Sequence, residues 1–214
     1  MGTIRNGANR GFKGKAGSVI GSSWKSIDYI KGLYKKRTKP ATEEQLIQQA
    51  KFTVLMRFLL PVTPFLRIGY GQKRADRATP VNMAFKENLP NAVAGMYPDF
   101  ILDYSMLRIS DGSYGSGGSQ TVAARSGEIT LTWDTELSTL YGTQADNSVY
   151  ILLYQPAIDE FLSAPTPPTR ADGTVSITIP SHFLGGAAHV WTFFADRKGN
   201  KVSKSSYLGE VNLN

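Results

Sequence analysis

The chain of 214 residues contains no cysteine and only two histidines. The absence of cysteine excludes disulfides, thiolate metal sites and cysteine nucleophiles, so stability must come from packing or from association with other chains. The two histidines, His182 and His189, are not joined by a closely spaced carboxylate that would complete a set of metal ligands. We therefore expect surface or packing roles for both histidines, no metal site and no cofactor.

The sequence also lacks a targeting signal and a long apolar run. Its N-terminus has no apolar core of the Sec signal-peptide kind, and no stretch of about eighteen apolar residues occurs in it. These absences predict a protein without a membrane span that is cytoplasmic or is released by a route other than Sec.

Catalytic constellations are missing as well. There is no G-x-S-x-G elbow, and Ser181 next to His182 does not make a triad. Asp159 and Glu160 are adjacent, and because adjacent side chains point in different directions they do not form a general acid/base pair. We expect a protein that is not an enzyme and has no small-molecule substrate.

Charge is abundant but unevenly distributed along the chain. Residues 1–87 contain 17 Lys/Arg and five Asp/Glu, a net charge of +12, whereas residues 88–214 contain seven and twelve, a net charge of −5. Such asymmetry indicates that the basic half meets a polyanion or the acidic half of another copy; the alternative is an uneven, solvated surface.

Residues 1–40 form a basic stretch in which apolar side chains alternate with glycines. The stretch has too many glycines for a helix and too many apolar residues for a linker. Its segments AGSVIGSSW and SIDYIKGLY are typical of short strands, so we expect a hairpin or an extended arm. The side chains predicted to drive assembly through this arm are Phe12, Val19, Ile20, Trp24, Ile27 and Tyr29.

The same stretch carries the cations that would contact a polyanion or an acidic partner. The densest cluster is KKRTKP at residues 35–40, which a solvated linker would also explain. The predicted contact residues are Arg5, Arg10, Lys13, Lys15, Lys25, Lys35, Lys36, Arg37 and Lys39.

A helical segment is expected over residues 41–96. Thr42 is a good N-cap, with Gln45 at the capping-box position, and Pro80 is placed to start a second helix. Between these helices, Pro61 and Pro64 leave room for only a short helical turn or a loop. The core-facing positions predicted for the first helix are Ile47, Ala50, Val54, Leu55, Phe58 and Leu59.

Residues 97–214 show a regular β pattern. Apolar and polar residues alternate in EITLTW and TVSITIP, and turn signals such as DG at 172–173 separate the strands. The glycine-serine loop at 110–120 is predicted to be flexible. This spacing predicts an antiparallel sandwich of the immunoglobulin or fibronectin type III kind. The fold class is therefore α+β: a basic arm, a helical pair and a β-sandwich.

Several motifs together resemble a known family. They include GFKGKAGSVIGSSWK, KPATEEQLIQQAKF, YPDFILDY and the closing SYLGEVN. They are similar to an uncharacterised Bacteroidota family, a domain of unknown function with an N-terminal GKxGSVxGxxWK motif and a C-terminal immunoglobulin-like β domain. The resemblance covers nearly the whole chain and implies the architecture, but it implies no activity, cofactor or catalytic residue.

Two functions fit these observations. The first is a structural protein that self-assembles as a head-to-tail homo-oligomer into a filament, sheath or virion-like shell, its arm adding strands to a sheet edge of the next copy. The second is a nucleic-acid-binding protein that uses its basic half, with the β domain as an accessory interaction module. We favour assembly, because a purely polyanion-binding arm could omit apolar residues such as Phe12 and Trp24.

Overall fold

The computed structural model describes residues 2–3, 13–24, 27–36, 38–72 and 78–213. Within these residues the chain has three α-helices and four antiparallel sheets, so the α+β class is confirmed. The chain divides into two compact units, residues 1–46 with 75–78 and residues 47–74 with 79–214.

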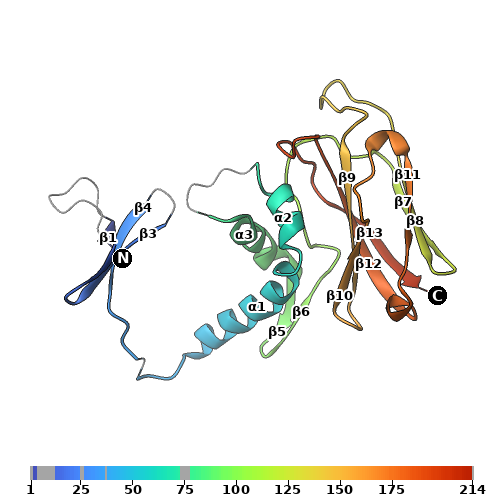
Figure 1. The fold of residues 1–214 in the computed structure, drawn as a ribbon. Helices are drawn as coiled ribbons and strands as arrows, with labels where there is room; N and C mark the ends of the chain where they lie inside the picture. The colour runs from blue at the N-terminus through green and yellow to red at the C-terminus, as the bar shows by residue number, and fades with distance from the viewer. Residues whose placement is uncertain (1, 4–12, 25–26, 37, 73–77, 214) are drawn as a thin grey trace. The chain divides into compact units, whose positions relative to one another are not determined.

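The first unit contains a four-stranded antiparallel sheet. In the order β1-β4-β3-β2, its strands are β1 (Gly2–Thr3), β4 (Ile27–Gly32), β3 (Val19–Trp24) and β2 (Gly14–Ala16) (Figure 1). The two segments predicted as strands form the β3–β4 hairpin, in which Trp24 lies opposite Ile27. Gly17, in the turn between β2 and β3, has a φ of 59°, a conformation that glycine adopts without steric cost. The prediction of strands in these two segments is thereby confirmed.

The segment predicted to form a pair of helices contains three helices, α1 (Glu43–Leu59), α2 (Thr63–Gly69) and α3 (Pro80–Ala92). Thr42 and Gln45 form the expected capping box, and Thr79 Oγ1 accepts a hydrogen bond from the N–H of Asn82 at 3.2 Å. The additional helix is α2. Pro64 starts this helix instead of breaking it, because a proline in the first turn lacks only an N–H that has no partner within the helix.

α1 buries less of its apolar face than its spacing predicts. Of the six predicted core positions, Leu55, Phe58 and Leu59 are buried, whereas Ile47, Ala50 and Val54 are half-buried. The hydrophobic core to which this helix contributes begins at Leu55, so only the last turns of α1 enter it. Within the described residues, no single helix is long and apolar enough to cross a membrane; α1 and α2 meet that test only as a pair bent by 88°.

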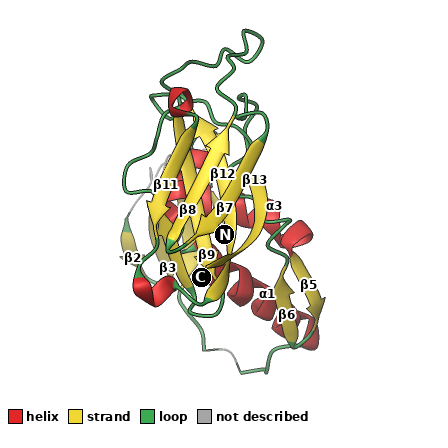
Figure 2. Ribbon diagram, turned by 90° about the vertical axis from the view of Figure 1, so that its right-hand side faces the viewer, coloured by secondary structure: helices red, strands yellow, loops and turns green. Residues whose placement is uncertain are grey.

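The second unit contains a sandwich of two antiparallel sheets (Figure 2). One sheet has the order β7-β8-β11 and comprises β7 (Gln120–Arg125), β8 (Glu128–Trp133) and β11 (Thr174–Thr178). The other has the order β10-β9-β12-β13 and comprises β10 (Glu160–Ser163), β9 (Ser148–Gln155), β12 (Gly186–Ala195) and β13 (Ser206–Leu213). Two short 3-10 helices, η1 (Arg170–Asp172) and η2 (Ser181–Phe183), flank β11.

β9 and β12 are buried on both faces, because two hydrophobic cores meet on them. One core lies between the two sheets and joins Ile129 and Leu131 of β8 to Leu153 of β9. The other core joins the helices to the opposite face of the same sheet, where Phe58 contacts Trp191 with their ring centroids 5.7 Å apart. The helices and the sandwich therefore fold as one unit.

The predicted domain boundary at residue 96 falls within a hairpin. β5 (Val93–Met96) pairs with β6 (Asp99–Leu102) in a two-stranded sheet of its own, and the sandwich strands begin only at β7. The division between compact units lies near residue 46 instead, because the helices share a core with the sandwich.

Residues 110–120, for which the glycine-serine content predicts flexibility, make several anchoring contacts. Ser110 is buried, and its hydroxyl donates to the carbonyl oxygen of Ser203 at 2.7 Å. The N–H of Tyr114 donates to the carbonyl oxygen of Val202 at 3.0 Å, and its hydroxyl donates to Asn147 Oδ1 at 3.0 Å. These bonds hold the segment along the end of the sandwich.

Candidate functional site

One face of the N-terminal sheet gathers most of the predicted assembly residues. Side chains of directly opposite residues in an antiparallel pair share a face, and successive residues alternate between faces. Ile20 lies opposite both Lys15 and Lys31, and Ser22 lies opposite Tyr29. This face, called the apolar-lysine face below, contains Lys15, Ile20, Trp24, Ile27, Tyr29 and Lys31. Val19 lies on the other face of the sheet, and Phe12 lies outside the described residues.

The apolar side chains of the apolar-lysine face are only partly buried. Ile20, Trp24, Ile27 and Tyr29 are all half-buried. Among the described residues, no side chain before Leu55 belongs to either buried core. A small sheet in water needs a covered apolar face for stability, so we expect another surface to pack against the apolar-lysine face.

The predicted polyanion contacts that the structure describes are all exposed. They are Lys13, Lys15, Lys35, Lys36 and Lys39. Within the described residues none of these lysines forms an ion pair, and Tyr34 beside Lys35 is 87% exposed. The remaining predicted contacts, Arg5, Arg10, Lys25 and Arg37, lie outside the described residues.

In the part of the chain that the structure describes, β11 is an edge strand of the sandwich and pairs with β8 alone. The N–H of Trp133 donates to the carbonyl of Gly173, and the N–H of Ile179 donates to the carbonyl of Gly127. Because backbone groups alternate in direction along an antiparallel strand, those of Thr174, Ser176 and Thr178 point away from β8. Within the described residues these outward N–H and C=O groups make no hydrogen bond.

The other sandwich edges are protected in ways that β11 is not. β10 has four residues, begins with Glu160, and is followed by Pro165, Pro167 and Pro168. β7 and β13 lie beside each other, and Gln120 Nε2 donates to Ser206 Oγ at 3.5 Å. β11, with the sequence TVSIT, contains neither a charge nor a proline.

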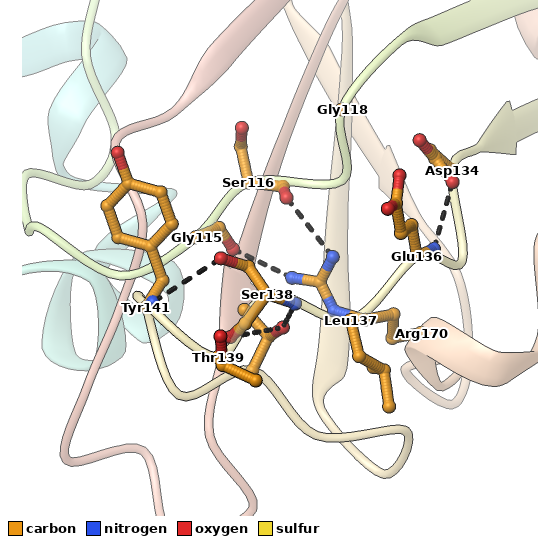
Figure 3. A pocket seen from close by; sticks show the side chains of 11 residues that line it. Gly115, Ser116, Gly118, Asp134, Glu136, Leu137, Ser138, Thr139, Tyr141 and Arg170 are labelled. Carbon is orange, nitrogen blue, oxygen red and sulfur yellow. Dashed lines mark hydrogen bonds between the residues drawn. The ribbon is translucent and has the colours of Figure 1, made fainter.

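An acidic loop, residues 134–147, begins next to the first residue of this free edge. The loop carries Asp134, Glu136 and Asp146, all exposed, and it contains no lysine or arginine. Its apolar side chains are exposed too, Leu140 to 84%. A cleft of about 530 Å³ separates the loop from residues 115–118 (Figure 3). The end of the sandwich beside β11 is therefore acidic and partly apolar.

Arg170 forms the inner wall of this cleft and anchors the surrounding loops. Its side chain is 1% exposed, and its guanidinium donates to the carbonyl oxygens of Gly115 at 2.7 Å and Ser116 at 3.1 Å (Figure 3). The guanidinium carbon lies 4.4 Å from the ring centroid of Phe194. Burial lowers the pKa of Arg170. Sequence reasoning missed this residue, because an arginine between loop residues carries no signal of burial.

A second cleft, of about 510 Å³, lies between α1, β6 and the β9–β10 turn. Its walls include Phe58 and Tyr104, and its polar groups include Arg57, Tyr154 and Asp159. Hydrogen bonds from Tyr154 and Arg57 lower the pKa of Asp159, while burial and the bond to Asp159 raise the pKa of Tyr154. The polar groups bond to one another, so this arrangement ties the helix to the turn.

The two histidines have packing and surface contacts. The ring of His189 stacks on Tyr104 at a centroid distance of 4.2 Å, and its Nδ1 is 2.8 Å from the hydroxyl of Tyr207. Burial lowers the pKa of His189. His182 Nε2 lies 3.1 Å from a carboxylate oxygen of Glu160. In the part of the chain that the structure describes, no group of three or more histidines and carboxylates could hold a metal ion.

Fold and surfaces together define a mixed α+β protein, a sandwich with helices packed on one sheet and a separate basic sheet. The chain belongs to DUF6266, a family of unknown function whose model matches residues 11–209. A comparison with curated proteins finds no match. The resemblance to a family of unknown function is thus confirmed, whereas the Bacteroidota origin stays a prediction.

Proposed function

We propose that this protein is a non-enzymatic structural protein that self-assembles. Its N-terminal sheet docks on the sandwich of the next copy, and repetition of this head-to-tail contact builds a filament, a sheath or a virion-like shell. The observation that carries the proposal is the apolar-lysine face, which combines four apolar residues that are only half-buried with two lysines.

Physical cost supports a partner for this face. Fully burying a large apolar side chain contributes about 1.5–3 kcal/mol relative to leaving it exposed. Ile20, Trp24, Ile27 and Tyr29 are already half-buried. A contact that buried them fully would therefore contribute part of this free energy for each of the four side chains. The local charges also support a second copy as the partner, since the N-terminal sheet presents the exposed Lys15, while loop 134–147 of the sandwich carries three exposed carboxylates and no lysine or arginine.

Removal of residues 1–24 tests the proposal. Both hydrophobic cores lie after residue 54, so the shortened chain should keep its fold, its circular dichroism spectrum and a cooperative thermal transition. It should be monomeric in sedimentation velocity, while the intact chain forms oligomers visible by negative-stain electron microscopy. An intact chain that stays monomeric at high protein concentration would contradict the proposal.

Nucleic-acid binding is a second candidate, favoured by one surface observation. Tyr34 is 87% exposed and is followed by the exposed Lys35 and Lys36, a combination of stacking and charge that suits single-stranded nucleic acid. Binding of labelled mixed-sequence single-stranded DNA, followed by fluorescence anisotropy, should weaken steeply with salt and after Tyr34→Ala. The absence of binding at low salt would rule this function out.

We also infer that the sandwich is of the immunoglobulin and fibronectin type III kind. Support comes from its seven strands, divided into sheets of three and four in the orders β7-β8-β11 and β10-β9-β12-β13. In this arrangement β10, the fourth strand of the sandwich, pairs with β9 and not with β11. Nuclear Overhauser effects between β10 and β9 should be present, and contacts between β10 and β11 backbones would contradict the inference.

A further inference from the structure

We propose that β11 is the acceptor edge for assembly and that its occupant is β2, Gly14–Ala16, of a second copy of this chain. This inference rests on the proposed self-assembly and adds to it a pairing between two strand edges. Added to β11, β2 would extend the three-stranded sheet of one sandwich into the N-terminal sheet of the next copy.

The acceptor is defined by backbone groups at the strand edge that no described residue pairs with. Thr174, Ser176 and Thr178 present outward N–H and C=O groups, and the described residues offer these groups no partner. The inward side chains of the strand, Val175 and Ile177, pack against the core of the sandwich, so the edge is held rigidly in extended form. A rigid extended strand pays little additional entropy when another strand pairs with it.

The donor is defined by its position in the N-terminal sheet. Among the described strands, the order β1-β4-β3-β2 leaves β2 at an edge, where it pairs with β3 alone. The other edge strand, β1, has two residues and offers less ladder than the three residues of β2. Lys15 within β2 and Lys13 just before it are both exposed.

Charge selects this pairing over the alternatives. Around the start of β11 lie the exposed carboxylates of Asp134, Glu136 and Asp172, and Glu128 lies opposite Thr178 at the other end. The nearest cation of the same sheet, Arg125 on β7, lies opposite Glu128, so the carboxylates available to an incoming lysine are those at the start of β11. Pairing of β2 with another β2 would bring like charges together at Lys15, whereas pairing with β11 places the lysines near carboxylates.

The proposed contact between β2 and β11 is heterologous and can repeat from one copy to the next. Because β2 and β11 are different parts of the chain, each copy keeps one unused donor and one unused acceptor after pairing with a neighbour. Such heterologous contacts generate rings if the rotation closes and filaments if it does not. The proposal therefore accounts for growth beyond a dimer.

Ser176→Pro is the sharpest single test. Proline removes the outward N–H of Ser176, which takes no part in the ladder with β8, so the sandwich should still fold. Self-association should weaken about tenfold or more in sedimentation velocity, because one ladder bond is lost and the ring obstructs the incoming strand. Ser176→Ala is the matched control and should associate like the unmodified chain. If Ser176→Pro fails to give a cooperative thermal transition, Ser176→Lys serves in its place.

Cross-linking gives a second, independent measurement. The natural chain has no cysteine, so introduced thiols can pair only with each other. Lys15→Cys protein should be mixed with Thr174→Cys, Ser176→Cys or Thr178→Cys protein and oxidised. At least one mixture should give a covalent heterodimer, whereas Thr121→Cys on β7, the opposite edge strand, should give none.

The outcomes separate this inference from the proposed function. A monomeric unmodified chain would overturn both. Oligomers that persist in Ser176→Pro, together with no cross-link at any β11 position, would overturn the β2–β11 pairing and leave self-assembly standing. A disulfide homodimer of Lys15→Cys alone, in preference to the mixed product, would show β2–β2 pairing and would overturn the inference as well.

Discussion

The Arg57 guanidinium donates two hydrogen bonds to Oδ2 of Asp159, from Nε at 2.9 Å and from Nη2 at 2.6 Å. Oδ1 of the same carboxylate accepts a hydrogen bond from the hydroxyl of Tyr154 at 2.7 Å. Asp159 has a φ of 55°, a left-handed conformation that aspartate tolerates better than most residues. One carboxylate thus joins α1 to the turn between β9 and β10.

Asp159→Asn should destabilise the protein in a pH-dependent way. The bonds from Tyr154 and Arg57 lower the pKa of Asp159 in the folded state, so its carboxylate contributes stability above the unfolded pKa of about 3.9. That contribution is lost as the pH falls through the folded pKa. The difference in unfolding free energy between the natural chain and Asp159→Asn should be constant above about pH 5 and shrink below about pH 4. Urea titrations at several pH values measure it, and a difference that grows on acidification would refute the assignment.

Asn88→Ala should cost about 2 kcal/mol or more of unfolding free energy, because it leaves buried backbone groups unpaired. Asn88 is fully buried; its Nδ2 donates to the carbonyl of Arg108 at 2.8 Å, and its Oδ1 accepts from the N–H of Arg108 at 2.7 Å. Asn91→Ala on the same helix is the matched control, since Asn91 is exposed. Equal chemical-denaturation midpoints for the two variants would argue against this role of Asn88.

Arg170→Met should destabilise the sandwich by about 2–4 kcal/mol, since it leaves the carbonyls of Gly115 and Ser116 without their charged donor. Thermal unfolding and hydrogen exchange should both register the change, and exchange should rise over residues 114–118. Arg197→Met replaces an exposed arginine in the β12–β13 turn and should stay within about 0.5 kcal/mol of the natural chain. Unaltered exchange in Arg170→Met would mean that the loop is held by other contacts.

Ile20→Ser should weaken self-association more than Ile30→Ser. Ile20 lies on the apolar-lysine face, whereas Ile30 lies opposite Gly21 on the other face, and both side chains are half-buried in the same sheet. Loss of one buried apolar contact predicts about a tenfold weaker association for Ile20→Ser. The concentration dependence of sedimentation coefficients compares the two variants directly. Equal effects would show that this face is not the docking face.

Local signals in the sequence determined much of the secondary structure. The capping box of Thr42 and Gln45, and Thr79 before Pro80, mark the observed helix starts because cap bonds join residues three positions apart. The turn signal DG at residues 172–173 also marked a turn correctly. Gly173, directly before β11, has a φ of 66°, a conformation that glycine adopts without steric cost. The alternation in EITLTW likewise placed Ile129 and Leu131 in the core.

Long-range packing decided what local patterns left open. The apolar spacing of α1 is continuous, yet Ile47 is only half-buried, because burial depends on whether a second surface lies against each turn. The burial of Arg170 could not be predicted for the same reason. Its partners at residues 115 and 116 are more than fifty positions away in the sequence.

The two assembly surfaces illustrate the same division. The sequence by itself determined that residues 19–24 and 27–32 form strands and that the first half of the chain is basic, since periodicity and charge are properties of the residues. Only the tertiary structure decided that Ile20 shares a face with Lys31 and that β11 is an edge. A strand such as TVSIT has the same alternation whether it has one neighbour or two, because backbone hydrogen bonds to a second strand leave no trace in side-chain order.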